Sequence, residues 1–221
     1  SETLTNKTLT DAVAITNSVT GEIIPGKIEG TNFTDSLLVG HATTGTLSSA
    51  EDNTGVGIGA LNALTSGDGN TSVGSEAGGA INSGIRNTTI GAIAGDAITT
   101  SQQNTAVGYS SLTTNISGDK NTAIGAFSLN ATTGKFNIGV GKGAGANISS
   151  GDGNVIIGSD INVSSATGSR QLIIAGNDGT TTTTWISGDS SGNVTVAGTL
   201  TTSSGAVAAQ ADVTALAIAL G

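Results

Sequence analysis

The chain has 221 residues, of which 35 are glycine, and only 2% are aromatic and 10% charged, so neither bulky aromatic residues nor a dense charged surface can organise its fold. A formal net charge of −9, with seven Lys and Arg residues in total, argues against binding to nucleic acid or to anionic lipid. The absence of cysteine excludes disulfides and Cys-ligated metals, and no apolar stretch is long enough to cross a bilayer.

Residues 1–52 mix short apolar alternations with polar residues and break at Pro25-Gly26, which predicts extended structure. We expect this segment to connect the chain to the rest of an assembly or to cap the first repeat. His41 is the single histidine, and no neighbouring residues suggest a catalytic or metal-binding role for it. It is expected to be an ordinary surface or turn residue.

A pentapeptide of the form Asn-x-x-Val/Ile-Gly recurs seven times between residues 53 and 158. Its asparagines are 17 residues apart in every interval but one, which is 16. This period is too short for a helical hairpin or a propeller blade, and the Thr, Val and Ile residues favour an extended chain. The repeat predicts an all-β fold, a parallel β-solenoid of about seven coils, roughly 30 Å long at the usual strand spacing.

Strand alternation places the second and fourth residues of each pentapeptide on one face and the other three on the opposite face. The first of these faces is β-branched in every copy, so we expect it to pack inward, with a core formed by Val56, Val73, Ile90, Val107, Ile124, Val140 and Ile157. The third residue is small in six copies, so another surface is expected to approach that side as well. The first residues are expected to form a hydrogen-bonded ladder rather than a ligand site: Asn53, Asn70, Asn87, Asn104, Asn121, Asn137 and Asn154.

Polar, glycine-rich turns close the repeats, and several contain an aspartate, as at Asp68, Asp119 and Asp152. Their spacing does not match a calcium-binding nonapeptide repeat, so ordinary Asx-type turns are the better interpretation than calcium sites. A coil of seventeen residues encloses little volume, so an isolated rod would bury modest area against its conformational entropy. We therefore expect a homo-oligomer, with three-fold symmetry suiting a parallel bundle of rods.

Residues 159–202 contain Leu172-Ile-Ile-Ala175, Trp185-Ile186 and the alternating Val194 and Val196, which predict a small β cap or module over the last coil. Residues 203–221 place Val213, Leu216 and Leu220 at helical intervals. This spacing predicts a short C-terminal helix, which could form a three-chain bundle.

The sequence offers no catalytic constellation: carboxylate pairs with aromatic sugar platforms, nucleophile and base pairs, and metal-ligand clusters are all missing. We expect no enzymatic activity, cofactor or metal. The evenly spaced threonines at 54, 71, 88, 105 and 122 leave an ice-binding lattice as an alternative, although Ile138 and Val155 interrupt it.

The run Asn104-Thr-Ala-Val-Gly-Tyr-Ser-Ser-Leu112 and the copy Asn121-Thr-Ala-Ile-Gly125 resemble the repeats of tailed-bacteriophage fibres, and are similar to those of trimeric autotransporter adhesin heads. The flanks at 4–9, 36–45 and 192–200 resemble segments of marine phage structural proteins. The resemblance implies a left-handed, homotrimeric β-roll in a virion fibre that contributes to bacterial host attachment. Its partners would be further copies of the chain, other virion or tail proteins and a bacterial receptor. The alternative is the head of a trimeric adhesin on a bacterial cell surface.

Overall fold

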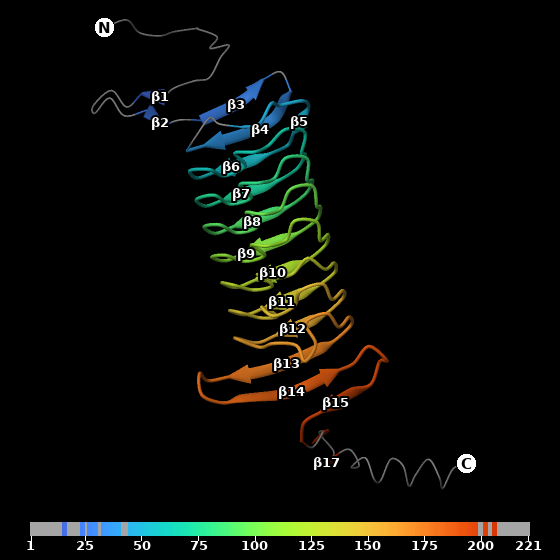
Figure 1. Cartoon of the computed structure of the whole chain (residues 1–221). Coiled ribbons are helices and arrows are strands. Elements are labelled where there is room, and N and C mark those ends of the chain that lie inside the picture. The colour runs from blue at the N-terminus through green and yellow to red at the C-terminus, as the bar shows by residue number, and fades with distance from the viewer. Residues whose placement is uncertain are drawn as a thin grey trace, which may run out of the picture.

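The computed structural model describes residues 15–16, 23–24, 26–30, 32–40, 44–198, 201–202 and 205–206, and every regular element in these ranges is a strand. Most strands belong to a single 13-stranded sheet, drawn in Figure 1 as a stack from the blue N-terminal end to the orange C-terminal end. Two small antiparallel pairs lie outside it: β1 (Ile15–Thr16) with β2 (Ile23–Ile24), and β16 (Thr201–Thr202) with β17 (Gly205–Ala206). The residues whose spacing predicted a C-terminal helix lie outside the described residues.

The centre of the large sheet is a run of short parallel strands, one from each coil. Neighbours pair in parallel from β4 to β13, while β3, β14 and β15 pair antiparallel at the two ends. The strands are β3 (Gly26–Gly30), β4 (Phe33–Val39), β5 (Ala50–Glu51), β6 (Thr54–Val56), β7 (Thr71–Val73), β8 (Thr88–Ile90), β9 (Thr105–Val107), β10 (Thr122–Ile124), β11 (Ile138–Val140), β12 (Val155–Ile157), β13 (Leu172–Asn177), β14 (Thr182–Gly188) and β15 (Val194–Val196). The prediction of an all-β parallel solenoid is confirmed.

The stack contains about eight turns of some 17 residues rather than seven, because one further turn precedes the first recognisable repeat. Strand β4 pairs in parallel with β6, so Leu37 lies beside Thr54 and Val39 beside Val56. Ser36 takes the place of the missing asparagine, with its Oγ accepting a hydrogen bond from the backbone N–H of Asn53 at 2.8 Å. The sequence pattern missed this turn because its first residue is not asparagine.

The glycine that ends each pentapeptide lies at the corner where the chain leaves the sheet. Gly91, for example, has a φ of 128°, and a Cβ added to it would lie 2.6 Å from the carbonyl oxygen of Gly108 in the next coil. A side chain would therefore be both strained and obstructed. This explains the glycine at the fifth position of every copy.

The expected core residues do not lie in the core, which corrects the sequence interpretation. In each strand from β6 to β12 the central residue is buried, and the residue after it faces outward. Exposure reaches 38% at Val56 and 42% at Ile124, and Val107 and Val140 are partly exposed. The outward-facing set is Val56, Val73, Ile90, Val107, Ile124, Val140 and Ile157.

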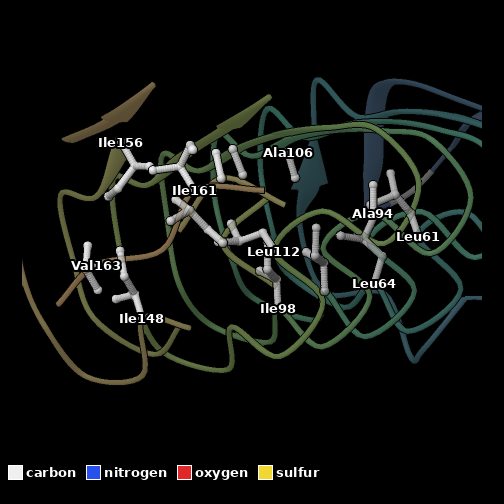
Figure 2. Packing of buried hydrophobic residues seen from close by; sticks show 14 of the residues in the cluster. Leu61, Leu64, Ala94, Ile98, Ala106, Leu112, Ile148, Ile156, Ile161 and Val163 are labelled. Carbon is white, nitrogen blue, oxygen red and sulfur yellow. The ribbon is translucent and has the colours of Figure 1, made fainter. Parts of the chain in front are cut away.

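The interior is filled instead by the third residue of each pentapeptide and by Leu and Ile residues from the opposite wall of the coil. Ile98, Leu112 and Ala106 show this arrangement inside the coils in Figure 2. In six of the seven copies the third residue is small, as at Gly139, where an added Cβ would lie 2.9 Å from Cγ of Leu129, while the last copy has the fully buried Ile156 there. Because successive side chains of a strand point to opposite faces, the fourth residue is left outside the coil.

A ladder of buried asparagine side chains runs through the stack beside this core. The Oδ1 atom of Asn70 accepts hydrogen bonds from the backbone N–H and the side-chain amide of Asn87, at 3.0 and 3.1 Å. The amide of Asn87 also donates to the carbonyl oxygen of Ser101 at 2.9 Å. The same backbone contact recurs from Asn53 to Asn154, where Gln171 ends the series. Because these polar groups bond to one another, the ladder serves structure rather than ligand binding.

Candidate interaction surface

The described residues place the acidic side chains of the turns in contacts between neighbouring coils. They contain no group of three or more His, Asp or Glu side chains that could hold a metal ion. The turn aspartates instead join the coils: Oδ1 of Asp68 accepts from the backbone N–H of Glu51 at 3.0 Å, and Oδ1 of Asp152 accepts from that of Lys135 at 2.7 Å. Asp119 makes the same contact to Gln102 at 3.0 Å. His41 lies outside the described residues. Within them, no helix could span a membrane.

The most extensive exposed feature is the side of the large sheet that points away from the coil interior, which we call the outer face. The strand registers align its side chains in two columns that run along the stack. One column consists of Val39, Val56, Val73, Ile90, Val107, Ile124, Val140, Ile157, Ile174, Ile186 and Val196. The other consists of Leu37, Thr54, Thr71, Thr88, Thr105, Thr122, Ile138, Val155 and Leu172.

Neither column contains a charged residue, and its aliphatic members are partly exposed, reaching 36–42% at positions such as Val73, Ile90 and Ile124. The ion pairs between Lys135 and Asp119 at 3.4 Å and between Lys142 and Asp160 at 2.9 Å lie elsewhere. A soluble monomer rarely exposes so long an uncharged aliphatic surface. The outer face therefore has the character of an interaction surface.

Aromatic residues stand next to the ends of the strands. Tyr109 and Phe127 follow the corner glycines of successive coils and make an edge-to-face contact, with ring centroids 5.3 Å apart. At the opposite end of the strands, the ammonium group of Lys120 lies 5.1 Å from the ring centroid of Phe136. These exposed rings widen the surface on which a partner could pack.

No family model matches the chain, and neither the curated proteins nor the solved structures contain a significant match to it. A function can therefore be proposed only from the residues of the chain itself. Sequence reasoning had identified the residues of the outer face as aliphatic and regularly spaced, but had assigned them to the coil interior. Their exposure along the whole stack is the feature that needs a functional explanation.

Proposed function

We propose that the chain is one subunit of a homotrimeric virion fibre of a tailed bacteriophage, which contributes to attachment to the bacterial host and acts without catalysis. The observation that supports this proposal best is the outer face. Its aliphatic column continues beyond the coils onto the antiparallel strands β13, β14 and β15. A surface with that extent suits a partner of the same length as the roll itself.

A further copy of the chain has that length and that chemistry. In a parallel arrangement, each coil meets a coil of the next subunit, so columns with the same spacing can pack side by side along their whole length. Burial of apolar surface stabilises such a contact by about 25 cal/mol per Å². Three-fold closure lets each subunit use the same face and leaves no outer face unpaired.

The roll also has the mechanical properties that a fibre needs. Backbone hydrogen bonds join each coil to the next at the strands and at both corners, and the asparagine ladder adds side-chain bonds within the interior. A rod of this kind holds its ends at a fixed separation. Other virion proteins and a bacterial receptor are the partners that this role requires.

The head of a trimeric bacterial adhesin is the alternative, since it would use the same fold and the same interface. The two are distinguished by gene context, with virion genes favouring the fibre and an outer-membrane anchor favouring the adhesin. An ice-binding solenoid is a third candidate, because five threonines lie in one column of the outer face. Ile138 and Val155 interrupt that column, and a thermal-hysteresis assay tests the idea directly.

Light scattering on the purified chain tests the assembly. We expect three times the 21.2 kDa mass of one chain. Ile90→Asp should reduce this mass to that of a monomer, because it would bury an unpaired charge in each subunit's interface. Ile116→Asp is the matched control, since Ile116 is 57% exposed and lies in a turn outside the outer face. A well-folded wild-type monomer, or an Ile90→Asp variant that remains trimeric, would refute the proposed interface.

A further inference from the structure

The C-terminal cap carries a short hairpin that projects past the side of the roll. Only residues Leu172–Ile174 of β13 pair with β12, yet β13 continues to Asn177 and pairs there with the beginning of β14. Figure 1 shows these two strands as long arrows below the short strands of the coils. We call residues 176–185 the overhang. Because it extends beyond the corner where the coils turn, it lies beside the columns of the outer face and not within them.

Trp185, the only tryptophan of the chain, is presented by this overhang. The pairing of β13 with β14 is irregular between Ile174 and Ala175, and Trp185 has no partner in the register at that point. Its ring packs on Gly176: a Cβ added there would lie 2.7 Å from Cζ2 and 2.9 Å from Cη2 of the indole. The ring is thus supported by backbone and still 53% exposed to solvent.

Polar groups surround the exposed ring. Trp185 lines a shallow hollow together with Asn177, Asp178, Thr181 and Thr183, and Gly176 forms its base. The amide of Asn177 is fixed by a hydrogen bond from its Nδ2 to Oγ1 of Thr182 at 3.0 Å, and its Oδ1 accepts from the N–H of Gly179 at 2.7 Å. The aromatic and polar parts of the hollow are therefore held in place before any ligand arrives.

The carboxylate of Asp178 is fixed in the same way. Its Oδ1 accepts hydrogen bonds from the backbone N–H groups of Thr181 and Thr180, at 2.7 and 2.9 Å, and from the hydroxyl of Thr180 at 2.9 Å. The bonds from Thr181 and Thr180 lower the pKa of Asp178 to about 2, so the group is ionised at neutral pH. All three bonds use Oδ1, and among the described residues none donates a hydrogen bond to Oδ2, which remains available as an acceptor.

We propose that the overhang binds a neutral saccharide, with Trp185 stacking on the sugar ring and Asp178 accepting hydrogen bonds from its hydroxyl groups. A pyranose has an apolar C–H face and a rim of hydroxyl donors, which matches an aromatic ring beside carboxylate, amide and hydroxyl groups. The net charge of −9 and the ionised Asp178 disfavour acidic sugars. This inference rests on the proposed attachment function, because saccharides cover bacterial surfaces, and it names the class of ligand.

The single tryptophan makes the site directly measurable. The intact chain is titrated separately with glucose, galactose, mannose and N-acetylglucosamine, and tryptophan emission is recorded. At least one sugar should produce a saturable change, with a dissociation constant on the order of 1 mM for so shallow a site. Asp178→Asn should weaken binding of that sugar by about tenfold, since it removes a charge-assisted hydrogen bond. If none of the four sugars changes the emission, the proposal is wrong.

Two variants locate the binding on the surface. Trp185→Ala should abolish sugar binding measured by saturation-transfer NMR, while Ile116→Ala, which removes a similarly exposed apolar residue from a turn outside the outer face, should leave it unchanged. Both should retain the wild-type melting temperature. If Trp185→Ala binds the sugar as well as the wild type does, the proposal is wrong. It is also wrong if the wild type binds no sugar and Trp185→Ala loses oligomer mass, because Trp185 would then serve assembly. A trimer that binds no sugar rejects only this site, and a sugar-binding monomer rejects only the proposed assembly.

Discussion

Removal of one rung from the asparagine ladder should cost far more stability than the size of the side chain suggests. Asn87 is fully buried, and its side chain takes part in four hydrogen bonds. In Asn87→Ala, the N–H of Asn104 and the carbonyl oxygen of Ser101 lose the partners that they have in the ladder. A buried polar group left without a partner costs about 1–3 kcal/mol, so the two together should lower the free energy of unfolding by about 4 kcal/mol.

The assay is guanidinium unfolding followed by circular dichroism, at one fixed chain concentration because self-association would otherwise change the apparent stability. Asn62→Ala is the matched control, since Asn62 is exposed and lies on the same roll. This control should change the free energy of unfolding by less than about 0.5 kcal/mol. Equal effects of the two substitutions would refute the assignment of the ladder as a stabilising element.

Two further substitutions test the glycine corner of the coil and the partly buried carboxyl group of Asp96. Gly91→Ala should lower the free energy of unfolding by more than about 2 kcal/mol, because the added Cβ meets the carbonyl of Gly108. Gly179→Ala is the control: Gly179 also has a positive φ, but an added Cβ there meets no atom within 4 Å, so the loss of stability should be smaller. Similar melting temperatures for the two variants would contradict this explanation. Burial, with a smaller contribution from Glu76, raises the pKa of Asp96, whose buried Oδ1 has no hydrogen-bond partner among the described residues. Its charged form therefore destabilises the fold above the folded-state pKa, and this cost disappears as the pH falls through that pKa. Asp96→Asn should therefore stabilise the fold at pH 7 and raise its melting temperature. The gain in the free energy of unfolding should be less than about 1 kcal/mol, because the group is only partly buried, and this part of the pH dependence should disappear. An unchanged pH profile would exclude Asp96 as its source.

The repeating parts of the fold could be predicted from the sequence because each of their features recurs at a fixed interval. The seventeen-residue period identified the coils, and the asparagine positions identified the ladder, whereas the glycine that ends each copy was counted as a strand residue and only the structure places it at a corner. The first and last strands of the parallel series, β4 and β13, were harder to find. Ser36 and Gln171 occupy their asparagine positions with different side chains. Only the strand pairing of β4 and β13 shows that they continue the same series.

Which face of the strand points inward could be decided only from the tertiary structure. Alternation separates Val107 from Ala106 but is symmetric with respect to inside and outside, and hydrophobicity alone favoured the wrong choice. The decision depends on the opposite wall of the coil, where Leu112 and its equivalents already fill much of the narrow interior, so that most coils have a small inward residue on the strand. The overhang is a similar case: the position of Trp185 over Gly176 depends on a break in strand register that no local pattern marks. The sequence by itself thus determined the period and the ladder, whereas the narrow volume enclosed by each coil determined which side chains remain available to partners.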